Sequence, residues 1–263
     1  MSVETESLLL RRDVDGIAWL TLNRPAARNA LSVALMEAAQ SAVDAIAKDK
    51  SIKVVVIAGA GPGFCAGHDL REMRANPGRQ HYEALFRQCS RLMTSIVRLK
   101  KPVIARVHGV AAAAGCQLVA TCDLAVATSD ARFGVNGINV GLFCSTPMVA
   151  LSRAVGRKAA LEMLLTGDLI NAERAREIGL VNRVVPLERL DDEVLELGQQ
   201  IAGKLDLAVA IGKEAFYRQA ELGLDAAYAY TGEVMTENMM ARETEAGIDA
   251  FLEKRPPPWQ RPQ

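Results

Sequence analysis

The sequence has few of the side chains that usually mark a metal or redox centre. Its only histidines are His68, His81 and His108, and no two have the i, i+4 spacing of a helical metal-binding pair. The five cysteines form no C-x-x-C pair, so in a chain of 263 residues they predict buried thiols in a reducing compartment. We therefore expect no metal site, and the cysteine usage favours a cytoplasmic location.

Net charge and long apolar runs are also absent. Lys plus Arg and Asp plus Glu each number 31, so no net field attracts nucleic acid or an anionic membrane, and any anionic ligand must be held by local groups. No apolar run approaches about 18 residues without a charge or a helix breaker, which argues against a membrane span. Residues 1–15 lack the basic and apolar regions of a secretory or transit peptide.

What the chain does contain is an alternation of short β-branched runs with amphipathic stretches. The runs predict strands at Gly16–Leu22, Val54–Ala58 and Val103–Val107. Ser32 is a suitable N-cap for a helix, and a second helical stripe runs from Leu85 to Leu99. This order predicts parallel strands joined by crossovers, hence an α/β layer fold with its ligand site at the carboxyl ends of strands.

The β signal fades after about Leu187, where the chain becomes a series of amphipathic helices. We expect these helices at Asp191–Lys204, Leu207–Leu222, Asp225–Met240 and Ala241–Lys254. The predicted organisation is therefore a core at residues 1–186 and a helical region at 187–263. Because these helices carry more apolar surface than a lone tail can hide, we expect them to pack in an oligomer. The proline-rich residues 255–259 are expected to lie across the surface without forming helix.

Two segments place small residues between a strand end and a helix start. Residues 59–70 read GAGPGFCAGHDL, and residues 108–123 read HGVAAAAGCQLVATCD. Helix starts leave N–H groups without intrahelical partners, and a pair of them aimed at one point can stabilise negative charge on a carbonyl oxygen. The alternative is that both segments are tight turns whose small residues only permit close packing. A Walker-type phosphate loop does not fit, because Gly67 is followed by His-Asp and not by Lys-Ser/Thr.

With Leu22-Asn-Arg-Pro25 and Asn29-Ala-Leu31 upstream, these segments resemble the crotonase superfamily, the enoyl-CoA hydratase/isomerase family. The resemblance continues in order through Phe133-Gly134, Gly141-Leu142, Ala154-Val-Gly156, Leu165-Thr-Gly167-Asp168, Ala172, Ala175 and Gly179-Leu-Val181. It implies a crotonase-type spiral of β-β-α units with a C-terminal helical trimerisation region, assembled as a homotrimer or hexamer. It also implies an acyl-CoA thioester substrate and no separate cofactor, since coenzyme A is part of that substrate.

The resemblance further implies the positions of the site residues. Carried over to this sequence, backbone N–H groups of His68 and Ala114 hold the thioester carbonyl. The family usually has a small residue at the first of these positions, so the His68 side chain is unusual. Residues expected along the substrate and its CoA moiety are Arg28, Ala66, His68, Asp69, Leu70, Ala114 and Lys213, the last at a CoA phosphate.

The sequence departs from a hydratase at both acidic positions. Hydration of an enoyl thioester uses one group to activate water and another to place a proton on the α carbon. The two glutamates of the family fall on Gln117 and Gly137, and a glutamine amide cannot take or give a proton near neutral pH. We therefore expect weak hydratase activity. The stretches around Gln117 and residues 139–147 resemble the mitochondrial enoyl-CoA hydratase domain-containing subgroup, which shares the missing acids.

Candidate replacements for the acids each have a simpler interpretation. His68 is a possible base at the carbonyl, or a helix-start histidine that faces solvent or the CoA. Asp69 is more typical of a helix cap or a CoA contact than of an acid. Cys144 and Ser145 are more typical of a pocket wall than of nucleophiles, because the sequence offers no paired base. His108 is expected to shape the turn before Gly109.

Two function hypotheses follow. The first is an acyl-CoA enzyme of the lyase or isomerase class that stabilises a thioester enolate. The second is a non-catalytic acyl-CoA-binding or assembly protein, which the missing acids favour.

Overall fold

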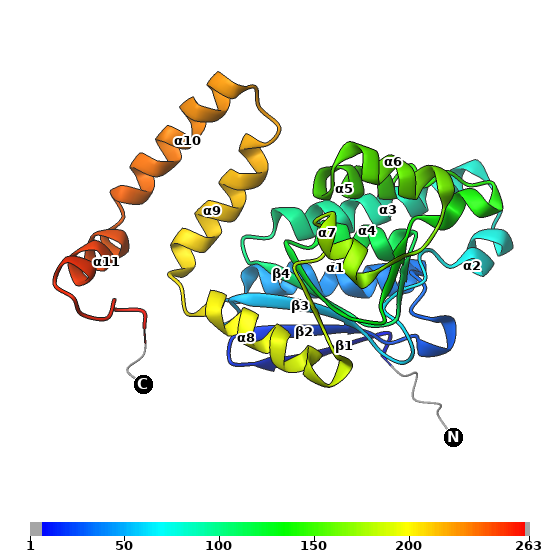
Figure 1. Ribbon diagram of the computed structural model, residues 1–263, viewed down its shortest axis with the longest axis horizontal. Coiled ribbons are helices and arrows are strands. Elements are labelled where there is room, and N and C mark those ends of the chain that lie inside the picture. Colours follow the sequence, from blue (N-terminus) through cyan, green and yellow to red (C-terminus); the bar gives the residue numbers. More distant parts are fainter. Residues whose placement is uncertain (1–6, 261–263) are drawn as a thin grey trace.

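A six-stranded sheet forms the centre of the structure, a computed structural model that describes residues 7–260 (Figure 1). The strand order is β1-β2-β3-β4-β6-β9, and every pair is parallel except β1 with β2. The strands span Leu9–Val14 (β1), Ile17–Leu22 (β2), Val54–Gly59 (β3), Val103–Val107 (β4), Leu124–Thr128 (β6) and Arg183–Val185 (β9). The three strands predicted from the sequence correspond to β2, β3 and β4, and their parallel pairing is confirmed.

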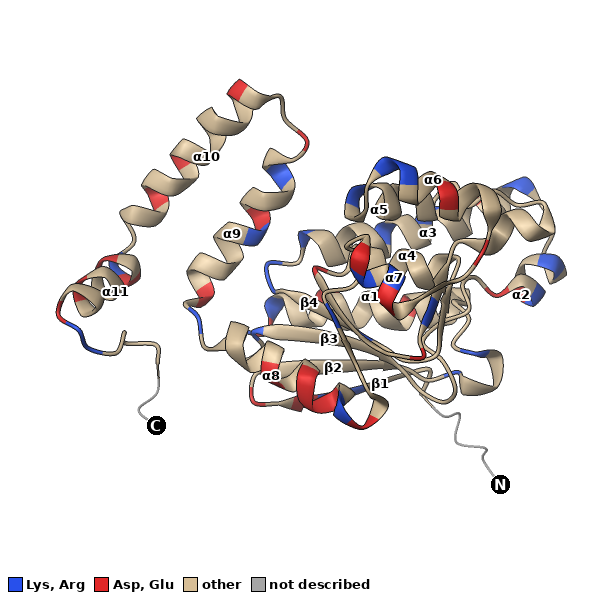
Figure 2. Cartoon of the chain, in the orientation of Figure 1, with Lys and Arg blue, Asp and Glu red and all other residues tan. Residues whose placement is uncertain are grey.

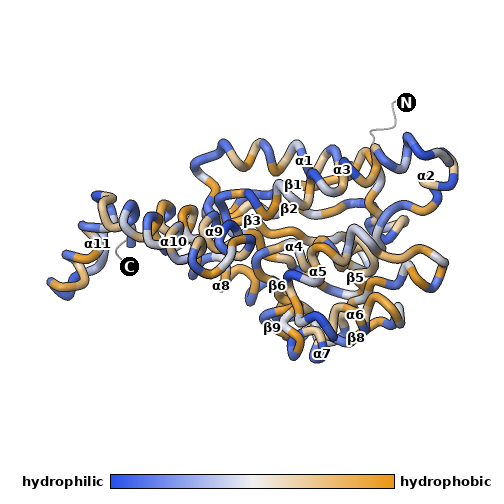
Figure 3. Tube along the Cα trace, turned by 90° about the horizontal axis from the view of Figure 1, so that it is seen from above, coloured by the Kyte–Doolittle hydropathy of each residue, from blue (hydrophilic) through white to orange (hydrophobic). Residues whose placement is uncertain are grey.

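Helices α1 (Val33–Lys48) and α3 (Arg79–Arg98) pack against each other over one face of this sheet (Figure 3). Ser32 caps α1 as predicted, because its hydroxyl accepts a hydrogen bond from the Leu35 N–H at 3.2 Å. The buried residues of α3 recur every three or four positions and are Leu85, Cys89, Leu92, Met93 and Ile96. Each helix thus buries one apolar stripe against the inward side chains of the strands.

A second, three-stranded sheet in the order β5-β7-β8 was not predicted from the sequence. Its strands span Val110–Ala112 (β5), Arg132–Gly134 (β7) and Ile170–Asn171 (β8). Runs of two or three residues are too short to show an alternating pattern, so only their tertiary pairing identifies them. The shorter helices around it are α2 (Leu70–Ala75), α4 (Ala114–Thr121), α5 (Pro147–Ala154), α6 (Arg157–Thr166) and α7 (Ala172–Glu177). Short 3-10 turns are η1 (Pro25–Ala27), η2 (Asn136–Val140) and η3 (Leu187–Arg189).

The four predicted C-terminal helices are present at nearly the expected positions. They span Leu190–Ala202 (α8), Asp206–Gln219 (α9), Leu224–Met239 (α10) and Arg242–Leu252 (α11). Helix α8 packs on the outer face of the central sheet, where its Leu190, Val194 and Leu197 meet side chains of β2 and β3. Helices α9 to α11 instead extend from the core as an arm (Figures 1 and 3). Within residues 7–260 no helix is both long and apolar enough to cross a bilayer.

Ion pairs add to the apolar contacts that hold α8 on the sheet. Acidic residues gather in its first turn (Figure 2). Asp191 pairs with Arg106 of β4 at 2.6 Å, and Glu193 pairs with Arg183 of β9 at 2.8 Å. The predicted boundary at residue 186 falls between β9 and η3, while these contacts group α8 with the core.

Candidate functional site

The first of the two small-residue segments forms a turn after β3 that Asn29 organises. The Asn29 side chain is fully buried, and its Nδ2 donates to the carbonyls of Ala60, Gly63 and Phe64 at 2.8 to 3.1 Å. Its Oδ1 accepts a hydrogen bond from the Arg24 N–H at 2.9 Å. One buried amide side chain therefore holds the turn, a role that no local sequence pattern around Asn29 indicates.

The second segment packs directly against the first. The Cys65 N–H donates to the Val110 carbonyl at 3.1 Å, and the Ala112 N–H donates to the Cys65 carbonyl at 2.9 Å. A Cβ atom on Gly115 would lie 2.2 Å from the Cys65 carbonyl oxygen, so only glycine allows this approach. His108 supports the same contact, since its Nε2 donates to the Gly61 carbonyl at 2.7 Å and its Nδ1 accepts from Arg106. The His108 side chain thus joins the two segments, whereas its predicted role in shaping the turn before Gly109 stays a prediction.

The backbone N–H groups of His68 and Ala114 are both unused where the two segments meet. Neither group donates a hydrogen bond to any acceptor in residues 7–260. Ala114 is the first residue of α4, so its N–H has no intrahelical partner. Its nitrogen lies 3.2 Å from the position that a Cβ atom of Gly67 would occupy, which brings it beside the residue that precedes His68.

This juncture is conformationally strained. Gly67 has a φ of +97°, and Ala113, the N-cap of α4, has φ +48° and ψ −116°. Alanine rarely adopts such a positive φ, and residues held in this way cluster at active sites and ligand clamps. Ala113 is held there by its N–H, which donates to the Gly134 carbonyl of β7 at 2.7 Å. The unpredicted second sheet thus positions the start of α4.

The residues expected along the CoA moiety divide into two groups. Arg28, Ala66 and Leu70 are exposed, and the Ala66 N–H donates to the Arg28 carbonyl at 3.0 Å. Asp69 is instead the N-cap of α2, where its carboxylate accepts from the Arg71 and Glu72 N–H groups. The interpretation of Asp69 as a helix cap is confirmed.

Asp69 also forms a half-buried ion pair with Arg24 at 2.9 Å. Burial opposes the ionisation of Asp69, but the Arg24 guanidinium and the two helix amides outweigh it and hold the pKa of Asp69 below its usual range. Asp69 is therefore a carboxylate with its partners in place, and it is not a proton donor near neutral pH.

The prediction that Lys213 reaches a CoA phosphate does not fit the structure. Its ammonium group is buried and donates to the carbonyls of Ile96 and Lys101, both at 3.0 Å, and to Asp123 at 2.6 Å. An ammonium group has three N–H donors, so all of them are used within the protein. The sequence pattern predicts a helix at Lys213, but the side of this helix that faces the Asp123 carboxylate is set by tertiary packing.

Gln117 and Gly137 lie in closed surroundings. The Gln117 side chain is buried, and its Oε1 has only a long contact with the Cys89 thiol, at 4.0 Å. A Cβ atom on Gly137 would lie 2.3 Å from the Leu142 carbonyl oxygen and 2.9 Å from Cys144 Sγ. A glutamate at Gly137 would therefore require the segment around Leu142 to move.

Cysteines surround this region, and their thiols stay protonated near neutral pH. Burial raises the pKa of Cys65, Cys89 and Cys116 to about 12, and it also raises that of Cys144. A thiolate is the nucleophilic form of cysteine, so Cys144 is unsuited to attack a thioester. The hydroxyl of Ser145 donates to the Phe143 carbonyl at 3.4 Å.

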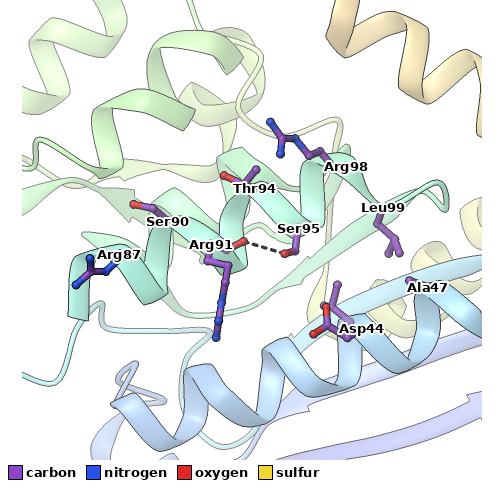
Figure 4. A pocket seen from close by; sticks show the side chains of 10 residues that line it. Asp44, Ala47, Arg87, Ser90, Arg91, Thr94, Ser95, Arg98 and Leu99 are labelled. Carbon is purple, nitrogen blue, oxygen red and sulfur yellow. Dashed lines mark hydrogen bonds between the residues drawn. The ribbon is translucent and has the colours of Figure 1, made fainter. Parts of the chain in front are cut away.

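Two open hollows lie elsewhere on the molecule. One, of about 540 Å³, runs between α1 and α3, where Figure 4 shows Arg87, Arg91 and Arg98 of α3 with Asp44 of α1. The other, of about 550 Å³, lies on the outer face of the sheet beside His108. Gly59 and Gly61 of the first turn line the second hollow, but neither hollow is lined by His68, Ala114 or Gln117.

Known proteins share this architecture over almost its whole length. The profile of a family described as Enoyl-CoA hydratase/isomerase matches residues 12–262. A crystal structure of an enoyl-CoA hydratase from Mycobacterium smegmatis is 58% identical, with a TM-score of 0.95, and covers 97% of this chain and 99% of its own. The fold is thus the α/β crotonase fold with C-terminal helices.

Relatives with curated names support the same family. Human mitochondrial enoyl-CoA hydratase domain-containing protein 3 is 46% identical over 248 residues, which cover 94% of this chain and 82% of the relative. Its crystal structure has a TM-score of 0.93 and is 44% identical, covering 96% of this chain and all of its own. The chain therefore belongs to the enoyl-CoA hydratase/isomerase family, as the sequence motifs indicated.

Proposed function

We propose that this protein binds an acyl-CoA thioester and stabilises its enolate with the backbone N–H groups of His68 and Ala114. The observation that supports this most directly is that neither N–H group has a partner among residues 7–260, at a juncture of two turns that pack in contact. The dipole of α4 adds positive potential at Ala114. Donors held in place before the substrate arrives need no reorganisation when charge develops on the oxygen.

Hydration is expected to be slow in this protein. General acid and base groups each contribute about 10² to 10⁴ in rate, and neither Gln117 nor Gly137 can transfer a proton. The thiols around them are protonated, and Asp69 is an ion-paired cap. The chemistry proposed for the site is therefore stabilisation of the enolate oxygen that forms when water adds to the β carbon of an enoyl thioester, with solvent water and no side chain taking and returning the proton.

Calorimetry with two ligands, one with and one without the thioester carbonyl, tests whether the N–H groups bind that carbonyl. Butyryl-CoA carries the thioester carbonyl, whereas S-butyl-CoA is a thioether without that oxygen. Two hydrogen bonds of about 1 kcal/mol each predict that the thioester binds at least tenfold more tightly. Equal affinity for the two ligands would contradict the proposal, because the N–H groups would then have no carbonyl to bind.

Turnover is tested with crotonyl-CoA and product identification by mass spectrometry. We expect slow hydration by the natural protein and an increase of about tenfold or more in Gln117→Glu, which reinstates one proton-transfer group. The Gly137→Glu variant is a poor test, since its Cβ atom would clash with the Leu142 carbonyl. Binding without any product, in the natural protein and in Gln117→Glu, would favour the alternative of a non-catalytic acyl-CoA-binding or assembly protein.

Assembly as a homotrimer or hexamer is part of the same proposal. It is supported by exposed apolar side chains on α10, at its C-cap and on α11, among them Tyr228, Met240, Phe251 and Leu252, each more than 70% exposed. A cytoplasmic location stays a prediction from the sequence.

A further inference from the structure

The outer face of the central sheet carries a hollow whose lining includes none of the residues proposed to bind the thioester. Its volume of about 550 Å³ lies within the range of small-molecule pockets. Thr21, Gly59 and Arg106 line it, and each lies at or next to the carboxyl end of its strand, in β2, β3 and β4 respectively. Ligands of α/β sheets bind outside the carboxyl ends of the strands. The hollow is therefore a candidate for a second ligand site.

Two cross-strand pairs of β1 and β2 form one wall of this hollow. Arg12 lies directly opposite Trp19, and Leu10 lies directly opposite Thr21. Side chains alternate along a strand, so Trp19 and Thr21 share the face that is turned away from α1 and α3. All four residues line the hollow. The wall thus combines a cation, an indole, a hydroxyl group and an aliphatic side chain.

The Arg12 guanidinium on this wall has no anionic partner. It is exposed and lies over the Trp19 ring, with its Cζ 5.5 Å from the ring centroid. The neighbouring Arg11 forms ion pairs with Asp13 and Asp49, whereas Arg12 pairs with no carboxylate among residues 7–260. A guanidinium group has five N–H donors and no acceptor. Arg12 is therefore free to bind an anion from solution.

Unused donors outnumber unused acceptors around the hollow. The Trp19 Nε1–H is closed off from solvent and has no acceptor in the described part of the chain, which leaves its partial positive charge unbalanced. The acceptors Asp191 and the Gly61 carbonyl are already bound, by Arg106 at 2.6 Å and by His108 at 2.7 Å. A carboxylate only accepts hydrogen bonds and matches a guanidinium group in geometry, so it complements this surface.

Apolar side chains border the same hollow. Leu10 and Leu187 both line it, and they are 45% and 59% exposed. An apolar tail that covers them removes apolar surface from water, which favours binding. An inorganic anion would leave these leucines uncovered. The ligand that fits both features joins one carboxylate to a short apolar tail.

We propose that this hollow binds a monocarboxylate with a short apolar tail. The carboxylate binds the Arg12 guanidinium and the Thr21 hydroxyl group, and the tail lies along Leu10 and Leu187. Binding draws Arg12 towards the carboxylate and so changes the surroundings of the Trp19 indole. The site is separate from the one proposed for the thioester and does not depend on it.

Calorimetry at pH 7.5 with hexanoate, 1-hexanol and acetate tests this site. Hexanoate is expected to bind at least tenfold more tightly than either of the others, because hexanol lacks the charge-assisted hydrogen bonds and acetate lacks the tail. Arg12→Gln should weaken hexanoate binding about tenfold, and Thr21→Val should weaken it independently. Arg11→Gln is the matched control, since it removes the same charge from the adjacent residue, which does not line the hollow, and it should leave the affinity unchanged.

Tryptophan fluorescence locates the bound hexanoate. The chain has two tryptophans, so in Trp259→Phe the signal comes from Trp19 alone. This signal should change with hexanoate concentration and saturate at the concentrations found by calorimetry. Absence of hexanoate binding, or binding that neither alters Trp19 fluorescence nor weakens in Arg12→Gln, would overturn the inference. Acetate binding as tight as that of hexanoate would contradict the role of the tail, and all of these results leave the proposed thioester function untouched.

Discussion

Single residues at the two turns determine how closely the backbone segments approach. Gly115 lies inside α4, where alanine is normally preferred by about 1 kcal/mol. Its missing Cβ nevertheless leaves room for the Cys65 carbonyl, which would otherwise be only 2.2 Å away. Gly115 therefore permits the close packing of the two turns, while the start of α4 leaves the Ala114 N–H unused, so the two interpretations of the turns are compatible.

We expect Gly115→Ala to destabilise the protein by about 1–3 kcal/mol and to weaken thioester binding, because the added methyl group forces the turns apart. The free energy of unfolding is measured by urea denaturation and the affinity with butyryl-CoA. Gly212→Ala is the control, since Gly212 is exposed in α9 and a Cβ atom there meets nothing within 4 Å. The free energy of unfolding of this control should rise by about 0.5–1 kcal/mol. Equal stabilisation by both substitutions would show that the turns tolerate the methyl group.

At the scale of elements, one buried ion pair connects the C-terminal arm to the core. Lys213 of α9 binds Asp123 at the start of β6, and the Asp123 carboxylate also accepts from Tyr217 at 2.8 Å and from the Val103 N–H at 2.6 Å. Burial lowers the pKa of Lys213, although Asp123 opposes it, and burial beside that carboxylate raises the pKa of Tyr217 above its usual range. The contact joins α9, β4 and β6 around one carboxylate.

Lys213→Ala is expected to lower the free energy of unfolding by about 3–5 kcal/mol, because it leaves the buried Asp123 charge without its cation. Amide hydrogen exchange in α9 should become faster in the same variant. Lys100→Ala serves as the comparison, since it removes an exposed ion pair with Glu214 of the same helix, worth about 0–1 kcal/mol. Similar losses in the two variants would mean that Asp123 is satisfied without Lys213.

At the scale of the whole molecule, the arm presents apolar side chains that the core does not cover. Phe251 and Leu252 at the end of α11 are 82% and 71% exposed. Surfaces of this kind in soluble proteins usually mark contacts with another chain. The family resemblance and this exposure both favour a homotrimer or hexamer, which stays a prediction.

The double substitution Phe251→Glu/Leu252→Glu is expected to shift the protein to a smaller assembly, because two buried carboxylates would oppose the contact. Light scattering coupled to size-exclusion chromatography gives the mass of each form. A Gln199→Glu variant, on an exposed position of α8, controls for the added charge and should keep the natural mass. An unchanged mass in the double variant would place the contact elsewhere.

The elements that sequence alone predicted are those with strong local signals. A β-branched run bounded by glycine or proline, as at β3 and β4, and a helix with an N-cap and one apolar stripe, as at α1, carry enough local information to be recognised. The family motifs, which occur in the expected order along the chain, also identified the family correctly. The three short strands of the second sheet and the capping of the turn by Asn29 have no such local pattern.

The sequence by itself determined the α/β class, the helical C-terminal region, the family and the absence of glutamates at Gln117 and Gly137. Only the tertiary structure decided that the His68 and Ala114 N–H groups have no partner within the described residues, that Lys213 binds Asp123, and that the His68 ring and Gln117 both lie against α3. The physical reason is that these properties depend on contacts between residues distant in the chain. Hydrogen-bond partners and burial are set when the layers pack, whereas periodicity and capping act within a few residues.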